Sequence, residues 1–242
     1  MKKLFYLLLP AWFAAATMPL MGQTCASGYC PGSITVEHVQ GKVSPQTITI
    51  TYPVVSNSAS GSPVCWLYQN LGASTAPTAY NDATATAAGW YWQWGFAQGY
   101  YFATATGGLT YPLTENTTAA TTSAGATWPA TTDPCTLLLG TAGSNSWHVP
   151  SKTDWNYIYT AYSSTFAAGY YSALKLHMAG GMTMSGGVHQ VNPGNPNGVY
   201  WSGTGANSNS GYDLGFNTNT VWATTDFTNS LYGFPIRCCR LP

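Results

Sequence analysis

The side chains of this 242-residue chain that could do chemistry are its cysteines, histidines and carboxylates. The six cysteines are Cys25, Cys30, Cys65, Cys135, Cys238 and Cys239. An even number favours disulfides in an oxidising compartment, where six cysteines allow 15 connectivities. A zinc site is less favoured, because no second matched pair that includes histidine follows Cys25 and Cys30. Cys238 and Cys239 are adjacent, so on a strand they would point to opposite faces and find different partners.

The histidines and carboxylates form no pattern typical of catalysis. His148 and His177 lie in apolar surroundings, which favours packing and hydrogen bonding over an acid–base role. The acidic residues are isolated from one another in the sequence: Glu37, Asp82, Glu115, Asp133, Asp154, Asp213 and Asp226. No nucleophile is accompanied by a base and an orienting partner. The sequence therefore predicts a protein that is not an enzyme, with no metal site and no cofactor.

The composition excludes several classes of protein. Charged residues make up 6% of the chain, against roughly 25% in ordinary globular proteins. Apolar residues make up 45%, which is enough for a core and argues against charge-driven disorder. The few basic residues are scattered, whereas nucleic-acid binding needs a concentrated basic surface. We therefore expect no nucleic-acid partner.

Residues 1–22 are predicted to be a secretory signal peptide. Lys2 and Lys3 precede an apolar run over residues 4–16, which is shorter than the about 20 residues of a membrane-spanning helix. Cleavage fits the Ala14-Ala15-Ala16 pattern or a cut after Gly22, and we place it after Gly22. No later segment is apolar enough to span a bilayer, so we expect a secreted or cell-surface protein, with the periplasm as the alternative.

A strand and a helix are the secondary-structure elements that the sequence predicts most clearly. Over residues 47–55 threonines alternate with apolar residues, as in a half-buried strand, and Pro53 predicts that this strand lies on an edge or ends there. Residues 56–63 are rich in Ser, Asn and Gly, which divides the chain into an N-terminal β segment with its linker, 23–60, and a main domain, 61–242. Ser151 and Asp154 have the spacing of a helix capping box. One apolar helical face follows, formed by Trp155, Ile158, Tyr159 and Tyr162.

The rest of the chain is rich in turns. Residues 114–132 are mostly Thr, Ala and Ser, which predicts a long surface loop. Beyond residue 180, short apolar pieces at 199–201, 214–216 and 234–236 predict short strands joined by loops.

Four sequence segments occur in an order that is typical of one family. They are CWLYQNLGA at 65–73, GWYWQ at 89–93, DPC at 133–135 followed by WHVPSKTDW at 147–155, and YWS at 200–202 followed by GFPIRC at 233–238. Together they resemble the FISUMP family, the Fibrobacter succinogenes major paralogous domain, over roughly residues 61–242. The resemblance implies an α+β, C-type-lectin-like fold with a small twisted antiparallel sheet and two short helices. It also implies that the N- and C-terminal strands lie together and that a large loop region presents ligands.

The resemblance also implies roles for the cysteines. On this fold Cys135, just before the helix, is expected to reach Cys238 on the last strand, and Cys30 to reach Cys65, with Cys25 near Cys239. Relatives that generate formylglycine use a reactive cysteine pair that holds copper. Structural disulfides explain Cys238 and Cys239 better, so an oxidase is the least favoured reading.

A calcium site of the lectin type is not expected. Sugar-binding C-type lectins hold Ca²⁺ with a carboxylate-Pro-Asn loop and a Trp-Asn-Asp strand, and Ca²⁺ needs several carboxylates. Here Asn192-Pro193 and Asn195-Pro196-Asn197 carry no acid, and no Trp-Asn-Asp follows.

Most tryptophans fall inside the family motifs and are predicted to form the core rather than a ligand platform. These are Trp66, Trp90, Trp92, Trp147, Trp155 and Trp201. Tyr100, Tyr101 and Trp222 fall outside the motifs and are predicted to be exposed, where aromatic rings can contact a ligand.

Asparagines are concentrated near the C-terminus, with serines and tyrosines between them. They are Asn207, Asn209, Asn217, Asn219 and Asn229, and the tyrosines include Tyr212 and Tyr232. This pattern resembles the variable region of proteins diversified by retroelements, which use this fold and end in a similar segment. The simpler explanation is that Asn is a good turn residue.

We expect an exported, non-enzymatic binding or adhesion module whose ligand is a protein or glycan on a surface. Its ligand face would consist of loops between residues 200 and 232, with Tyr100 and Tyr101, because Asn, Ser and Tyr suit adaptable hydrogen bonding. The candidate contact residues are Tyr100, Tyr101, Asn207, Asn209, Tyr212, Asn217, Asn219, Trp222, Asn229 and Tyr232. One alternative is a structural subunit of a filament or surface layer, because scarce charge lowers the repulsion that opposes self-assembly.

Overall fold

The computed structural model describes residues 30–59, 64–82, 84–103, 116–140, 146–162, 166–185, 188–191, 197–222 and 227–242. Over these residues the chain is an α+β protein with antiparallel sheets and four short helices. The predicted signal peptide, residues 1–22, and Cys25 lie outside the described residues.

The first sheet joins strands from both ends of the chain, in the order β1-β2-β3-β13. Its strands are β1 (Ser33–His38), β2 (Ile48–Asn57), β3 (Val64–Leu67) and β13 (Cys239–Arg240). The strand expected over residues 47–55 is confirmed as part of β2. Because β2 pairs with β3 in antiparallel register, the N-terminal β segment belongs to the same sheet as the C-terminal strand.

The expectation for Pro53 is wrong, because β2 lies between β1 and β3 and continues beyond the proline to Asn57. Pairing with β3 begins one residue later, where Val54 faces Leu67. Pro53 supplies only its carbonyl, which accepts a hydrogen bond from the Tyr68 N–H at 2.8 Å. An interior strand thus tolerates the missing N–H at the point where its neighbour ends.

Two further sheets form the opposite part of the molecule. The five-stranded sheet has the order β5-β4-β12-β6-β7, with β5 (Gly99–Tyr100), β4 (Tyr91–Gln93), β12 (Gly233–Pro235), β6 (Met182–Ser185) and β7 (Val188–Val191). In the other, β9 (Ser210–Phe216) pairs with β8 (Gly198–Asn207), β10 (Val221–Trp222) and β11 (Phe227–Asn229). The short strands expected near 199–201, 214–216 and 234–236 are confirmed.

The described part of the chain forms four helices, where two were expected. They are α1 (Ala85–Ala88), α2 (Pro134–Leu139), α3 (Lys152–Tyr162) and α4 (Phe166–Leu174). The capping box of α3 is confirmed: the Ser151 N–H donates to Asp154 Oδ2 at 2.8 Å, and the Asp154 N–H donates to Ser151 Oγ at 3.2 Å. Within the described ranges, none of these helices has both the length and the apolarity that crossing a bilayer requires.

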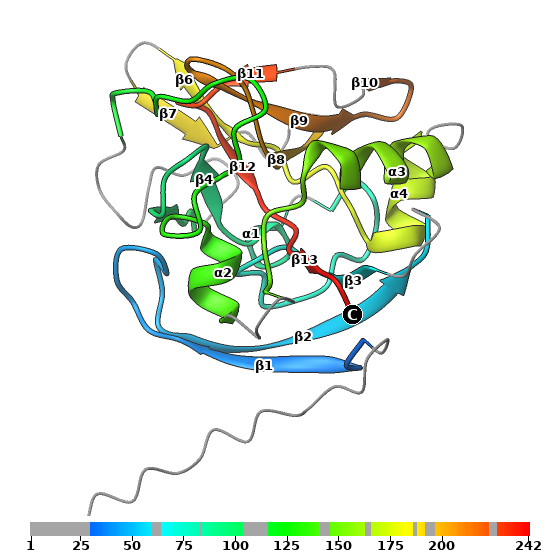
Figure 1. Cartoon of the computed structure of the whole chain (residues 1–242). Helices are drawn as coiled ribbons and strands as arrows, with labels where there is room; N and C mark the ends of the chain where they lie inside the picture. The colour runs from blue at the N-terminus through cyan, green and yellow to red at the C-terminus, as the bar shows by residue number, and fades with distance from the viewer. Residues whose placement is uncertain are drawn as a thin grey trace, which may run out of the picture.

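The C-terminal segment connects the two halves of the molecule. In Figure 1, β1 and β2 run along the lower side, β8 and β9 along the upper side, and α3 and α4 lie at the right. The chain from β12 to β13 crosses the middle between them. Residues between β12 and β13 can therefore contact elements that are far apart in the sequence.

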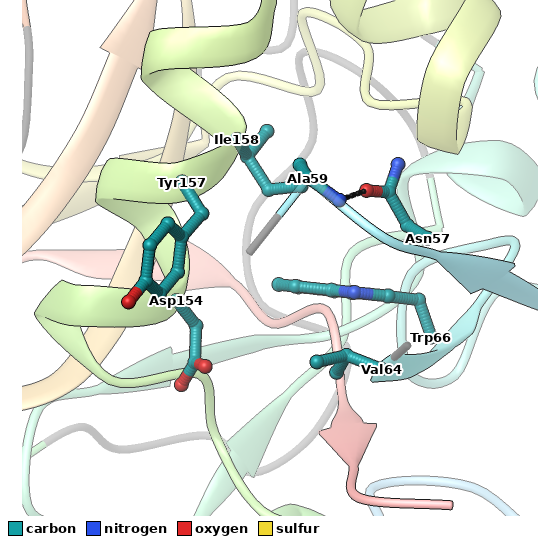
Figure 2. Close-up of a pocket in the computed structure, with 7 residues that line it drawn as sticks. All are labelled: Asn57, Ala59, Val64, Trp66, Asp154, Tyr157 and Ile158. Carbon is teal, nitrogen blue, oxygen red and sulfur yellow. Dashed lines mark hydrogen bonds between the residues drawn. The ribbon is translucent and has the colours of Figure 1, made fainter. Parts of the chain in front are cut away.

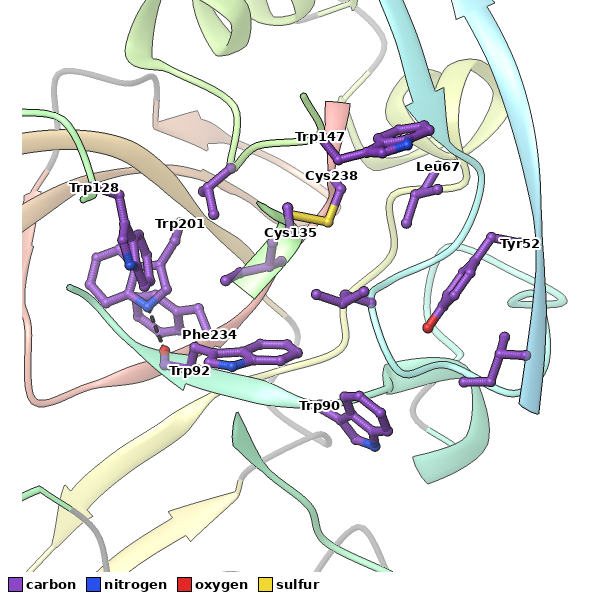
Figure 3. Close-up of a cluster of buried hydrophobic side chains, with 14 of the residues drawn as sticks. Tyr52, Leu67, Trp90, Trp92, Trp128, Cys135, Trp147, Trp201, Phe234 and Cys238 are labelled. Atoms are coloured by element: carbon purple, nitrogen blue, oxygen red, sulfur yellow. Dashed lines mark hydrogen bonds between the residues drawn. A yellow bond between two sulfur atoms is a disulfide. The ribbon is translucent and has the colours of Figure 1, made fainter. Parts of the chain in front are cut away.

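The core is dominated by aromatic rings, as the sequence predicts. Trp66, Trp90, Trp92, Trp147, Trp155 and Trp201 are all buried. Figure 3 shows the largest cluster, in which the Trp201 Nε1–H donates to the Trp92 carbonyl at 2.7 Å. The disulfide between Cys135 and Cys238 lies within this cluster and joins the start of α2 to the C-terminal segment.

Two of the three expected disulfides are confirmed, Cys30–Cys65 and Cys135–Cys238. Of the third pair only Cys239 is described, as a free, buried thiol whose Sγ lies 3.4 Å from His148 Nε2. Its side chain therefore contacts a histidine of the domain, and the expected partner Cys25 lies outside the described residues.

Two buried histidines predict an acid-sensitive fold. Burial lowers the pKa of His38 and of His177 to about 4 from the ordinary 6.5. Between these values the unfolded chain binds protons that the folded chain does not, so the free energy of unfolding decreases as the pH falls from 6.5 to 4. We expect the melting temperature to fall over this interval, and to fall less steeply in His38→Gln. A melting temperature independent of pH there would contradict this assignment.

Candidate ligand-binding site

The candidate asparagines lie at two ends of one sheet. Asn207 and Asn209 are at the turn between β8 and β9, and Asn229 of β11 pairs with Ser210 at the same end. Asn217 and Asn219 follow the other end of β9, a strand of seven residues, or roughly 20 Å. The structure thus brings three of the five asparagines together and places two elsewhere.

Several asparagine side chains have a local structural role. Asn207 Oδ1 accepts a hydrogen bond from the Asn209 N–H, and Asn229 Oδ1 accepts one from the Leu231 N–H, at 3.1 and 2.9 Å. Asn217 Oδ1 accepts from the N–H groups of Asn219 and Thr220. These are the contacts by which Asn stabilises turns, so turn formation accounts for these three asparagines without diversification.

The expected exposure of Tyr100 is wrong. Strand β5 pairs with β4, so Tyr100 faces Tyr91 in the sheet and is fully buried. Its hydroxyl donates to Gln93 Oε1 at 2.6 Å. Tyr101 is half-buried against the main core cluster. Neither tyrosine forms part of an open aromatic platform.

The other aromatic candidates are partly covered. The ammonium group of Lys152 lies 3.7 Å from the centre of the Tyr212 ring, a cation–π contact at the start of α3. Tyr232 is half-buried and stacks with Phe234, with ring centres 6.4 Å apart. Trp222 lies in β10 opposite Gly215, and its side chain is outside the part that the structure describes.

A pocket of about 340 Å³ lies beside the end of the sheet that carries Asn207, Asn209 and Asn229. It is lined by Trp94 and Gly95 of the β4–β5 turn, by residues 120–123, and by Ala126, Thr127 and Pro129. We call it the threonine pocket. Its volume falls at the lower end of the range of small-molecule sites.

Backbone hydrogen bonds to β8 and to the hairpin turn hold the wall of the threonine pocket. The Thr122 N–H donates to the Ser208 carbonyl at 3.0 Å, and the Gly125 N–H donates to the Gly205 carbonyl at 2.9 Å. On the same segment, the Ala120 N–H donates to Ser230 Oγ at 3.0 Å. The loop expected over residues 114–132 is therefore attached, over its described part, to the asparagine-bearing end of the sheet.

Two glycines let the pocket wall approach the sheet closely. A Cβ at Gly205 would overlap the Thr122 hydroxyl and approach the Ser123 carbonyl to 2.8 Å. A Cβ at Gly211 would overlap the Trp94 ring. Trp94 is held from the other side as well, because its Nε1–H donates to the Ser202 carbonyl at 2.8 Å. The floor and the wall of the pocket are thus fixed by packing and by hydrogen bonds.

The lining of the threonine pocket is uncharged. It offers hydroxyl groups from Thr121, Thr122, Ser123 and Thr127, and an aromatic edge from Trp94. No lining residue carries a formal charge, so the pocket cannot offset the free energy that a charged ligand would lose when its hydration water is removed. The arrangement suits a small, neutral group that both donates and accepts hydrogen bonds.

The sequence interpretation missed these residues. It placed the ligand face between residues 200 and 232, which supply the neighbouring turn but not the pocket lining. The available signal was the segment 116–132, which is mostly Thr, Ser and Ala and carries no charged residue. This segment becomes the wall of the threonine pocket only through its hydrogen bonds to β8 and the turn after it, some 80 residues later in the chain.

Among the described residues, the adjacent Cys238 and Cys239 do not form a reactive cysteine pair. Cys238 is bonded to Cys135, and Cys239 is fully buried, where burial and nearby carboxylates raise the pKa of its thiol. A thiol of raised pKa is a poor nucleophile at neutral pH.

The fold and the pocket define a disulfide-bonded α+β protein with a neutral, hydroxyl-lined site. Comparison of the chain with family models, with curated proteins and with solved structures finds no match.

Proposed function

We propose that this chain is an exported, non-enzymatic binding or adhesion module that holds an uncharged, hydroxyl-rich group, such as a neutral sugar of a surface glycan. The threonine pocket carries this proposal, because its volume, its hydroxyl groups and its lack of charge match such a ligand. The turns at Asn207–Ser210 and Asn229–Tyr232 supply further polar contacts at the rim.

Export is supported by the two disulfides, which persist in oxidising compartments. A C-type-lectin-like fold of the FISUMP type is supported by the shared sheet of the N- and C-terminal strands and by the disulfide from the start of α2 to the C-terminal segment. In this proposal the rigid core presents the rim and the pocket to a target.

Filling the threonine pocket is expected to abolish binding. Thr121 is exposed and lines the pocket, so a tryptophan at this position would occupy the space without disturbing the core. Thr131, exposed in the same segment but outside the lining, provides the matched control. On an array of immobilised neutral oligosaccharides, acidic oligosaccharides and uncharged peptides, we expect wild type and Thr131→Trp to bind neutral sugars, and Thr121→Trp to bind them at least tenfold more weakly.

Two results of this array would contradict the proposal. One is equal binding by Thr121→Trp and wild type. The other is binding confined to the acidic oligosaccharides or to the peptides. The predicted alternative, self-assembly into a filament or layer, is checked separately by size-exclusion chromatography, where a monomeric chain would count against it.

A further inference from the structure

Three side chains with metal-binding atoms meet at the start of α3. His148 Nε2, a carboxylate oxygen of Asp154 and Cys239 Sγ all lie within 4.8 Å of one another. They come from the segment before α3, from the first turn of α3, and from β13. The sequence interpretation expected no metal site, because it found no second matched pair of cysteine and histidine and because the acidic residues are isolated from one another.

The backbone holds His148 and Cys239 opposite each other. The His148 N–H donates to the Cys239 carbonyl at 2.9 Å, and the Cys239 N–H donates to the His148 carbonyl at 3.1 Å. Such a doubly bonded antiparallel pair places both side chains on one face. The juxtaposition of imidazole and thiol is therefore built into the sheet rather than left to flexible side chains.

The imidazole of His148 is oriented as in metal sites. Its Nδ1 lies 3.0 Å from the Ser146 carbonyl, which can only accept, so Nδ1 carries the proton. Nε2 then faces Cys239 Sγ at 3.4 Å. Metal-bound histidines characteristically donate their second N–H to a carbonyl or carboxylate in this way.

The carboxylate of Asp154 is oriented as well. Its Oδ2 accepts hydrogen bonds from the N–H and the hydroxyl of Ser151, at 2.8 and 2.6 Å. Cys239 is a free thiol and is fully buried. A cation at this place would replace the thiol proton and offset the carboxylate charge.

We propose that His148 Nε2, Asp154 and Cys239 Sγ form a binding site for one zinc ion. A set of one nitrogen, one sulfur and one oxygen ligand suits zinc, whereas the thiolate excludes Ca²⁺ and Mg²⁺ as the preferred ions. With tetrahedral zinc–ligand distances of about 2.0 to 2.3 Å, the ligand atoms lie about 3.2 to 3.8 Å apart. Separations of at most 4.8 Å therefore need only small side-chain movements.

A small pocket lies beside Asp154, and neither His148 nor Cys239 lines it. Asp154 lines this pocket of about 10 Å³ together with Asn57, Trp66 and Tyr157 (Figure 2). This is about the space that one water molecule needs. Three protein ligands and one water complete a tetrahedral zinc site.

The test uses the mature chain with both disulfides formed. Zinc is titrated in competition with a chromogenic chelator, and cobalt is titrated as a spectroscopic substitute. We expect one equivalent of zinc to bind, and cobalt to give a near-ultraviolet thiolate-to-metal charge-transfer band. His148→Gln, Asp154→Asn and Cys239→Ser are each expected to weaken zinc binding at least tenfold, and Cys239→Ser to remove the band.

Two control variants separate metal binding from folding. Ser151→Ala removes the hydroxyl that orients Asp154 but keeps all three proposed ligands, so we expect it to lower the melting temperature and to weaken zinc binding less than the loss of any ligand does. Cys25→Ser removes the other cysteine outside the two disulfides. A cobalt band that persists in Cys25→Ser belongs to Cys239, which keeps the test valid if Cys239→Ser fails to fold.

Three results would overturn the zinc site. The first is a wild-type chain that binds no zinc. The second is zinc binding that is unchanged in folded His148→Gln and Cys239→Ser. The third is mass-spectrometric evidence that Cys239 forms a disulfide in the purified chain. Thr121→Trp should bind zinc like wild type. The test of the zinc site is therefore independent of the test of the threonine pocket.

Discussion

Replacing Cys135 and Cys238 together by alanine is expected to lower the free energy of unfolding by about 4 to 5 kcal/mol. The bond closes a loop with a sequence separation of 103 residues, for which the chain-entropy model gives about 4.7 kcal/mol. The bond also lies inside the aromatic cluster of Figure 3, where the replacement leaves a cavity. Urea-induced unfolding, followed by tryptophan fluorescence, measures the difference.

The second disulfide provides the matched comparison. Cys30 and Cys65 are separated by 35 residues, for which the same model gives about 3.8 kcal/mol. We therefore expect the Cys30→Ala, Cys65→Ala double variant to be the less destabilised of the two. If removing the Cys135–Cys238 bond lowers the free energy of unfolding no more than removing the Cys30–Cys65 bond does, the claim that the longer loop contributes more stability is wrong.

Arg237→Ala is expected to destabilise the fold by about 3 to 5 kcal/mol, because it removes a buried charge that several elements share. Arg237 is fully buried, and burial lowers its pKa to about 10, so it stays protonated at neutral pH. Its guanidinium donates to the carbonyls of Leu67 and Leu174, at 3.1 and 2.9 Å. It also donates to the Asn70 side-chain oxygen and to the Lys175 carbonyl, at 2.8 and 3.1 Å.

These contacts connect three parts of the chain. Leu67 ends β3, whereas Leu174 and Lys175 lie at the C-terminus of α4, where the helix dipole favours a cation. Arg237→Lys keeps the charge but cannot reach four acceptors in the same geometry, so we expect it to lose an intermediate amount of stability. A loss below about 1 kcal/mol in Arg237→Ala would show that these hydrogen bonds contribute little.

The sequence allowed good predictions where the determining contacts are local. Ser151 and Asp154 are three residues apart, and the alternation over residues 47–55 needs no distant partner, so α3 and β2 were predictable. Six tryptophans were predictable as core because they fall inside the motifs of the family that the sequence resembles. The Cys135–Cys238 bond followed from a resemblance to a family rather than from spacing.

Features that depend on distant pairing were not predictable. Pro53 sits in an interior strand because β3 ends beside it, and Tyr100 is buried because β5 pairs with β4. The threonine pocket needs the hydrogen bonds between residues 120–125 and the β8–β9 hairpin. Likewise, the contact of His148 with Cys239 spans 91 residues of sequence.

The central claim is that the ligand occupies the threonine pocket and the hairpin turn beside it. Hydrogen–deuterium exchange tests it most directly, on the wild-type chain with and without a saturating neutral oligosaccharide selected from the array. Slower exchange is predicted over residues 120–129 and 203–211, with no change over 217–220 at the other end of β9. Protection confined to 217–220, or none anywhere despite saturation, would contradict the claim.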